Sequence, residues 1–375
     1  PRKKFIQTHA REVVNLDTTM LLYKELVEVT TRDDVRLIVT RKRPVERTRE
    51  RTPVILVHGL GQNRFSWDLS RRSMMNFLVG EGFEVWNAEL RGHGLSRANG
   101  SPYPKEFDDY VDSDLPALID FVRRLSRHDK VFVVGHSLGA TIAYAAAHEQ
   151  QPHLKGLVSI AGPCHFGRGV PLLRGLAKVL GPLQRILRVD GLLPDYFLVD
   201  LIGVLASPVI NLIDHPLNRV LDHIWLPGSI ERDILLERVG LGFDRTGTAV
   251  IGILVRWADS GEFHDASRER DFEERLGEVE VPALFVTGDR DTAVPWPSVE
   301  GAFHNLRGPD KTWREFGRER DGVSFGHCDL ICGREAPRVV WPVIGAWLKE
   351  RDVADRGRAT FPEGPEEAPP RSSAR

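Results

Sequence analysis

A serine in the setting of a catalytic nucleophile lies near the middle of the chain. Ser137 is the centre of GHSLG (135–139), which fits the pattern G-x-S-x-G. The pattern lies between the apolar stretch KVFVV and the alanine-rich stretch ATIAYAAA, which places the serine on a sharp turn from a strand to a helix. The two glycines leave room for the close backbone contacts of that turn. The first amides of the helix, including the N–H of Leu138, would face an oxyanion that forms beside the serine.

A serine hydroxyl also needs a general base, and the base needs an acid that fixes its tautomer. His327 in SFGHCD follows the last predicted strand and precedes the final predicted helix. The loop GDRDTAVP, directly after the apolar stretch PALFV, offers Asp289 and Asp291. We prefer Asp291, because it lies inside the loop and not at the first position after the glycine turn, and we keep Asp289 as the alternative. The candidate catalytic residues are therefore Ser137, Asp291 and His327.

A second oxyanion donor is expected from HGLG (58–61), which directly follows the apolar stretch VILV. The backbone N–H of Leu60 is placed to act beside that of Leu138. The same glycines also fit a tight turn, and the two interpretations are compatible. RGHG (91–94) has a similar setting, and we expect it to stabilise a turn near the site without a catalytic role.

The cysteines offer little support for a metal centre. Cys328 and Cys332 lie beside His327, but their spacing is not that of the usual zinc pairs and no second Cys/His pair accompanies them. A metal there would also occupy the candidate base. We therefore predict no metal and no cofactor, with Cys328 and Cys332 packed against the final helix and Cys164 buried as a small apolar residue.

The elements that would position these residues follow from the apolar pattern. Short apolar runs alternate with helical patterns from Pro53 onward, which is typical of a parallel sheet covered on both faces. The residues 26–43 predict an antiparallel hairpin that turns at 32–34. The other predicted strands are 54–58, 83–89, 130–135, 156–162, 282–288 and 311–316. The predicted helices are 70–81, 110–127, 138–150, 298–305 and 336–349. The expected fold class is α/β, with a mostly parallel sheet and helices on both faces.

The alternation of predicted strands and helices stops after Gly162 and resumes near Val281. This leaves roughly 120 residues at a place where the loop after a strand usually takes only a few. Leucine, isoleucine and valine recur there at helical spacing, in 172–187 and 197–213. We therefore divide the chain into an N-terminal extension (1–25), a core (26–162 and 281–351), a helical cap inserted in the core (163–280) and a disordered tail (352–375).

The composition of the chain limits the classes of partner that it can bind. The 51 basic and 53 acidic residues give a net charge of -2, which provides no general attraction to nucleic acid, and we expect no nucleic-acid partner. The longest uncharged run of the cap, 201–213, is shorter than the roughly 20 residues of a membrane span. That run could pack the cap, line an acyl pocket or contact a membrane surface, so peripheral membrane contact stays open. Few cysteines and an N-terminal stretch without an apolar run favour a cytoplasmic location.

Together these motifs resemble the α/β-hydrolase superfamily. HGLG, RGHG, GHSLG, GDRDTAVP and GHCD follow one another in the order of that superfamily over roughly residues 26 to 350. The resemblance implies the α/β-hydrolase fold and an acyl-transfer site made of Ser137, Asp291 and His327. It also implies a small-molecule or lipid ester as substrate.

Two branches of the superfamily are most similar, at different places. Residues 58–94 resemble polyhydroxyalkanoate synthases, and residues 325–348 resemble the acid-lipase branch. Such synthases carry a cysteine in the elbow where this chain has Ser137, which favours hydrolysis over polymerisation. The resemblance implies a serine hydrolase that cleaves carboxylic esters with a lipophilic acyl chain. An acyltransferase or thioesterase related to the synthases and a non-catalytic scaffold remain the alternatives.

Overall fold

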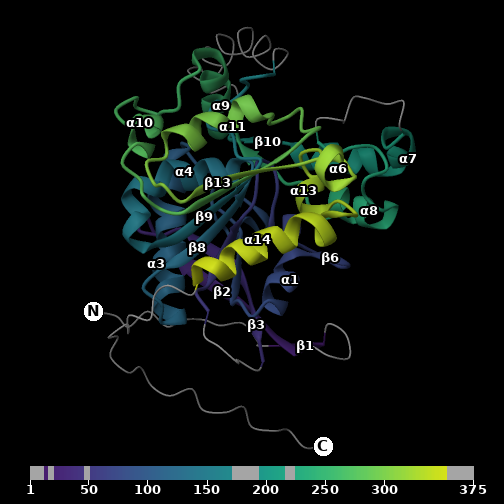
Figure 1. Ribbon diagram of the computed structural model, residues 1–375, viewed down its shortest axis with the longest axis horizontal. Helices are drawn as coiled ribbons and strands as arrows, with labels where there is room; N and C mark the ends of the chain where they lie inside the picture. The colour runs from purple at the N-terminus through teal and green to yellow at the C-terminus, as the bar shows by residue number, and fades with distance from the viewer. Residues whose placement is uncertain (1–11, 16–20, 46–50, 171–193, 216–223, 353–375) are drawn as a thin grey trace, which may run out of the picture.

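One central sheet organises the molecule (Figure 1). The computed structural model describes residues 12–15, 21–45, 51–170, 194–215 and 224–352. In spatial order the strands of the sheet are β1 (Glu12–Asn15), β2 (Leu21–Thr30), β3 (Arg36–Pro44), β7 (Val85–Ala88), β4 (Val54–Val57), β8 (Val131–His136), β9 (Leu154–Ile160), β12 (Ala283–Gly288) and β13 (Lys311–Phe316). The strands from β7 to β13 are parallel, and β1, β2 and β3 are antiparallel to their neighbours. The predicted mostly parallel sheet is confirmed.

Helices cover both faces of this sheet (Figure 1). On one face α1 (Met74–Gly80) packs against α14 (Ala336–Asp352). On the other face α3 (Leu115–Ser126), α4 (Leu138–Gln150), α10 (Phe272–Leu276) and α11 (Trp296–Asn305) form a continuous layer. Shorter elements lie in the loops: η1 (Arg64–Ser66), β5 (Asp68–Leu69), β6 (Arg72–Ser73), α2 (Gly94–Ala98), the π-helix η2 (Tyr110–Asp114), η3 (Gln151–His153), α12 (Arg318–Asp321) and α13 (Asp329–Cys332).

The burial of the strands explains their sequences. Every residue of β4, β8 and β12 is buried, as expected for strands with a helical layer on each face. In β2 burial alternates along most of the strand, because one face of this outer strand meets the solvent. Continuous apolar runs therefore mark the centre of the sheet, and alternating ones mark its edge.

Some boundaries differ from the prediction. The predicted helix at 70–81 begins only at Met74, because 68–73 forms the β5–β6 hairpin and the Ser73 hydroxyl caps the helix by accepting the Asn76 N–H at 2.9 Å. The predicted helix at 110–127 consists of η2 followed by α3. Residues 12–15 and 21–25, which we expected to form an N-terminal extension, are strand residues of the sheet.

The end of the described chain is anchored to the core. Asp352, which we expected in the disordered tail, is the last residue of α14, and its carboxylate accepts hydrogen bonds from Thr52 N–H at 2.8 Å and from Arg51 at 3.1 Å. The rest of the predicted tail, 353–375, lies outside the described residues, as does 1–11.

The segment inserted between β9 and β12 is mainly helical where it is described. It contains β10 (Tyr196–Phe197), α6 (Val199–Ala206), η4 (Ser207–Val209), α7 (Ile210–Ile213), α8 (Arg232–Leu241), β11 (Thr246–Gly247) and α9 (Thr248–Ser260), followed by α10. The predicted helical stretch 172–187 lies outside the described residues. In the part of the chain that the structure describes, no helix has the length and apolar character needed to cross a bilayer.

A buried ion-pair network ties the N-terminal hairpin to the core. The Arg91 guanidinium donates to Asp114 at 2.8 Å and to Asp33, in the turn of the hairpin, at 2.8 and 3.0 Å. The Arg91 side chain is 3% exposed and that of Asp114 is fully buried. Burial raises the pKa of Asp114 to about 6, so its charged form depends on Arg91.

We predict that Arg91→Met lowers the free energy of unfolding by about 3–5 kcal/mol, because it leaves Asp114 buried without its partner. Urea denaturation measures this change. As the matched control, Arg338→Met removes an exposed pair with Glu335 and should cost less than about 1 kcal/mol. Equal losses in the two variants would contradict the importance of the buried network.

Candidate active site

Ser137 stands on a strained turn between β8 and α4. Its φ of 52° and ψ of -120° lie in a region that L-residues rarely adopt. The flanking glycines permit the packing that imposes this turn. A Cβ on Gly139 would lie 2.3 Å from the carbonyl oxygen of Val57, and a Cβ on Gly135 would lie 2.4 Å from the backbone nitrogen of Ala140. The turn therefore has the form of a nucleophile elbow.

Asp291 and His327 are in direct contact. His327 Nδ1 lies 2.8 Å from Asp291 Oδ2, and both residues are buried. The other carboxylate oxygen of Asp291 accepts the backbone N–H groups of Ala293 at 3.0 Å and Val294 at 2.8 Å. These bonds fix the orientation of the carboxylate. Because Nδ1 is held by Asp291, a proton taken up by His327 would bind at Nε2.

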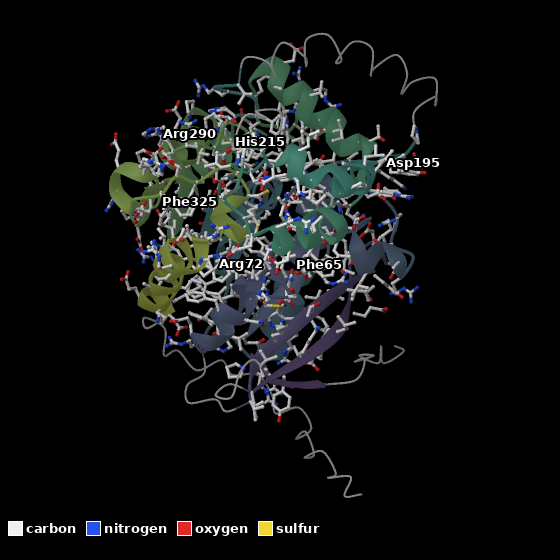
Figure 2. All side chains as sticks on the ribbon, turned by 90° about the vertical axis from the view of Figure 1, so that its right-hand side faces the viewer. Phe65, Arg72, Asp195, His215, Arg290 and Phe325 are labelled. Atoms are coloured by element: carbon white, nitrogen blue, oxygen red, sulfur yellow. The ribbon has the colours of Figure 1, made fainter. Side chains whose placement is uncertain are left out.

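Asp289 has a different environment. Its carboxylate accepts hydrogen bonds from Phe325 N–H and the Ser324 hydroxyl, both at 2.9 Å, and from Arg318 N–H at 3.2 Å. The backbone N–H of Arg290 donates to the Phe325 carbonyl at 3.1 Å, and Figure 2 shows both residues on the same side of the molecule. The structure thus brings Asp291, and not Asp289, to His327. Asp289 shapes the loop that precedes the histidine.

The histidine inside the elbow also contacts His327. His136 Nε2 lies 3.2 Å from the His327 carbonyl oxygen, so Nε2 carries the proton and donates it to this carbonyl. The two ring centroids are 4.6 Å apart. Burial lowers the pKa of His136 well below its usual value, which keeps the ring neutral. The elbow and the loop of His327 are therefore joined directly.

Ser137 and His327 line one cavity of about 400 Å³. Most of its wall is apolar and comes from both the core and the inserted segment. The apolar lining residues are Leu60, Leu138, Pro163, Phe166, Val170, Val199, Ile224, Phe243, Leu254, Ala293 and Val294, and the polar ones besides Ser137 and His327 are Gln62 and Thr292. Larger cavities lie elsewhere on the described surface, but among these cavities the one at Ser137 brings the predicted nucleophile and base together.

The two predicted oxyanion donors lie at this cavity. Leu60 and Leu138 both line it, and Leu138 is the first residue of α4, where a helix leaves its N–H groups without partners in the ladder. His58, just before this loop, accepts the Leu90 N–H at 3.3 Å, and burial lowers its pKa to about 4. His58 therefore links the loops that follow β4 and β7 as a neutral ring.

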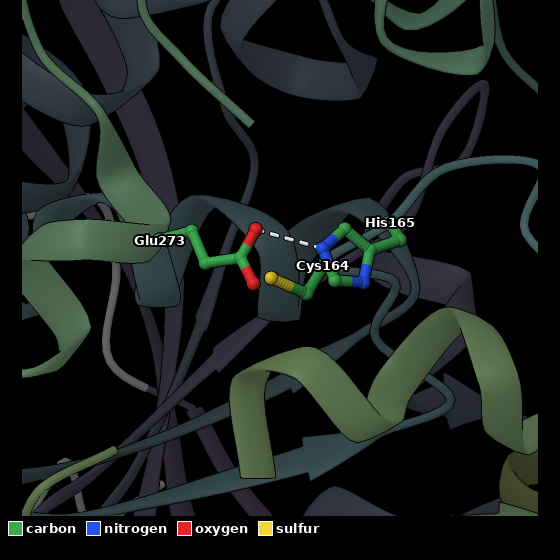
Figure 3. A group of neighbouring side chains, drawn as sticks. All are labelled: Cys164, His165 and Glu273. Carbon is green, nitrogen blue, oxygen red and sulfur yellow. Dashed lines mark hydrogen bonds and ion pairs between the residues drawn. The ribbon is translucent and has the colours of Figure 1, made fainter. Parts of the chain in front are cut away.

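Three side chains elsewhere could in principle hold a metal ion. The ligand atoms of Cys164, His165 and Glu273 all lie within 4.8 Å of one another (Figure 3). Both ring nitrogens of His165 already have partners, since Nε2 lies 2.7 Å from Glu273 and Nδ1 lies 3.0 Å from the Arg168 guanidinium. Burial also raises the pKa of the Cys164 thiol, which opposes the thiolate that a metal needs. A guanidinium beside the ring disfavours a cation, so these residues fit a structural link between the loop after β9 and α10.

Most of the cavity wall could not be found from the sequence. Phe166, Val199, Ile224, Phe243 and Leu254 come from separate parts of the inserted segment. Their apolar character is visible in the sequence, but nothing in their spacing relates them to Ser137. Val199 of this wall lies just before the run 201–213, for which an acyl pocket was one of three interpretations.

The chain is similar in sequence to several known proteins. The family described as serine aminopeptidase, S33, matches residues 48–202. The poly(3-hydroxyalkanoate) polymerase subunit PhaC of Haloarcula marismortui is 26% identical over 332 residues, which are 85% of this chain and 65% of that protein. The human lysosomal acid lipase/cholesteryl ester hydrolase is 30% identical over 159 residues, 40% of this chain and 37% of that protein. The chain thus spans about two thirds of the first relative and about a third of the second.

Solved structures show the same fold at low identity. The structure of DcsB in complex with its substrate analogue has a TM-score of 0.59 and 18% identity, covering 88% of this chain and 99% of that one. A soluble variant of monoglyceride lipase from Saccharomyces cerevisiae has a TM-score of 0.56 and 13% identity, covering 94% and 98%. The fold is that of the α/β-hydrolases, as predicted.

These matches and the fold confirm the predicted resemblance to the α/β-hydrolase superfamily. The predicted similarity to both polyhydroxyalkanoate synthases and acid lipases is also confirmed.

The strain at Ser137 leads to a stability prediction. Glycine adopts this backbone conformation without the Cβ penalty, so we expect Ser137→Gly to be more stable than Ser137→Ala by roughly 1 kcal/mol, after the entropy cost of glycine is subtracted. Thermal unfolding of the two variants, which both lack the hydroxyl, measures the difference. A less stable glycine variant would show that the elbow is not strained.

Proposed function

We propose that this protein is a serine hydrolase that cleaves carboxylic esters with a lipophilic acyl chain. The observation that carries the proposal is one cavity, mostly apolar, that holds Ser137 together with a histidine oriented by a buried carboxylate. Apolar walls suit an acyl chain, and the serine, histidine and carboxylate suit acyl transfer.

The proposed reaction has two acyl-transfer steps. The Ser137 oxygen attacks the ester carbonyl carbon, and its proton passes to His327 Nε2 while Asp291 stabilises the imidazolium through Nδ1–H. The N–H groups of Leu60 and Leu138 would donate to the oxyanion. His327 then gives its proton to the leaving alkoxide, and an ester of Ser137 remains. Water, deprotonated by His327, attacks this ester, and the carboxylic acid leaves as Ser137 regains its proton.

An acyltransferase or thioesterase is the first alternative. It is favoured by the match to a poly(3-hydroxyalkanoate) polymerase subunit over 85% of this chain. Both activities share the acyl-Ser137 intermediate and differ in the leaving group or in the acceptor of the second step. We favour hydrolysis because the nucleophile is a serine and because the residues around His327 resemble those of the acid lipases.

A non-catalytic scaffold is the second alternative. A scaffold has no need for a strained serine or for an oriented histidine beside it, and both are present here. Ester turnover that depends on Ser137 would exclude it.

The two aspartates of the acid loop provide a direct test of the mechanism. We predict that Asp291→Asn lowers kcat for a p-nitrophenyl ester by about 10⁴-fold, because the amide no longer holds the tautomer and charge of His327. Asp289→Asn should have a much smaller effect, since its partners are two backbone N–H groups and a hydroxyl. Ser137→Ala provides the zero-activity reference. If kcat falls equally in both Asn variants, Asp291 does not have the role of the acid that orients His327.

The apolar wall predicts a preference for longer acyl chains. Each additional buried CH₂ contributes about 0.8 kcal/mol, so kcat/KM should rise about fourfold per CH₂ until the cavity is filled. A series of p-nitrophenyl esters from acetate to dodecanoate measures this slope. Leu254→Phe, which narrows the cavity, should shift the optimum to shorter chains, whereas Val255→Phe, at a neighbouring position of α9, should not. An acetate optimum in the wild type would contradict the lipophilic substrate.

The acceptor of the second step is tested by product analysis. With an acyl ester or an acyl thioester as donor, we expect free acid to be the main product, with or without millimolar hydroxylated acceptor. Chromatography of the products measures the partition. If the transfer product exceeds free acid at modest acceptor concentration, the protein is an acyltransferase. Faster turnover of the thioester than of the matched ester would make it a thioesterase.

A further inference from the structure

A buried carboxylate two residues after His327 joins two segments that are far apart in the sequence. Asp329 Oδ2 accepts the backbone N–H of Gly326 at 2.8 Å and that of Leu226 at 3.1 Å. Asp329 Oδ1 accepts the Ser229 hydroxyl at 2.7 Å. Asp329 is 1% exposed, so these bonds are shielded from water. One side chain therefore holds the loop of the candidate base and residues 224–229 of the inserted segment.

Backbone hydrogen bonds join the same two segments. The Cys328 N–H donates to the Ile224 carbonyl at 2.8 Å, and the Arg334 N–H donates to the Ser229 carbonyl at 2.8 Å. Ile224 lines the cavity together with His327. Ile224 of the cavity wall and His327, the candidate base, thus lie on two segments. Backbone hydrogen bonds join these segments both before and after Asp329.

Asp329 is not an alternative acid for the triad. His327 Nδ1 is bonded to Asp291, and both oxygens of Asp329 already have donors of their own. Burial raises the pKa of Asp329 to about 6, although its three hydrogen bonds act in the opposite direction. What the site uses is the ability of two oxygens to accept three hydrogen bonds.

We propose that Asp329 is a positioning residue, which couples residues 224–229 to the loop of His327 so that the acyl-cavity wall and the general base keep one relative position. This inference rests on the proposed function, because His327 is taken as the base. Its consequence is that the inserted segment influences catalysis as well as substrate binding: a substrate that displaces the wall at Ile224 also displaces the base.

Substitution of Asp329 separates hydrogen bonding from charge. In Asp329→Asn, the amide oxygen can accept the two backbone N–H groups and the NH₂ can donate to the Ser229 hydroxyl, which can also accept. We expect this variant to keep kcat within about threefold of the wild type, and Asp329→Ala to lose about 10- to 100-fold in kcat through misplacement of His327. If Asn is as harmful as Ala, the charge matters and the positioning role is wrong. Wild-type kcat in the Ala variant would also overturn it.

Ser229→Ala tests the coupling itself, and it replaces Asp329→Ala as the test if that variant fails to fold. It removes only the bond on the side of the inserted segment, at a residue outside the loop of His327. Coupling predicts a severalfold fall in kcat, with the pH profile of kcat/KM unchanged in shape. A change in KM alone would mean that the wall moves without the base, which would contradict the proposal.

Amide hydrogen exchange gives a readout that does not depend on turnover. In Asp329→Ala and Ser229→Ala, we expect faster exchange in 224–229 and in 324–328 together. The matched control is Ser324→Ala, which removes a similar hydroxyl–carboxylate bond, to Asp289, and should leave exchange in 224–229 unchanged. Faster exchange in only one segment would overturn the coupling. Absence of Ser137-dependent ester turnover in the wild type, with coupled exchange intact, would instead overturn the proposed function.

Discussion

Carboxylates that accept backbone N–H groups shape the loops at the carboxyl end of the sheet. Asp291 orders its own loop, and Asp289 orders the approach to His327. Asp329 holds this same loop to the inserted segment. Loop N–H groups have no ladder to bond with, and a buried N–H without a partner is costly, whereas one carboxylate can satisfy two or three of them. Together with the hydrogen bond from His136 to the His327 carbonyl, these acceptors hold the loop that carries His327.

Much of this architecture could be predicted from the sequence. Continuous apolar runs bounded by glycine and proline located β4, β8 and β12 within one or two residues, because strands buried on both faces tolerate little else. The choice between Asp289 and Asp291 could not be settled there, since it depends on which carboxylate the turn at 291–294 directs toward His327. The helix predicted at 70–81 begins too early, because the hairpin at 68–73 has no apolar pattern that would mark it. The cavity wall and the role of Asp329 depend on contacts across about a hundred residues of chain, which local pattern cannot show.

The two local resemblances noted in the sequence fall on different parts of the proposed site. The synthase-like residues 58–94 include Leu60, the proposed oxyanion donor, and Arg91 of the ion-pair network. The lipase-like residues 325–348 carry His327 and Asp329, for which we propose roles in proton transfer and in its coupling to the cavity wall. Neither part alone defines an activity. The elbow serine and the access of water to the acyl intermediate would decide the reaction.

Covalent labelling tests most directly whether Ser137 is an activated nucleophile, on which the proposed mechanism depends. A fluorophosphonate probe reacts with a serine that an adjacent base deprotonates. Intact-mass analysis with peptide mapping should show one adduct per chain, located on Ser137, and His327→Ala should slow its formation by orders of magnitude although the fold is kept. A wild-type protein that is folded and unlabelled, or labelled on another residue, would contradict the account.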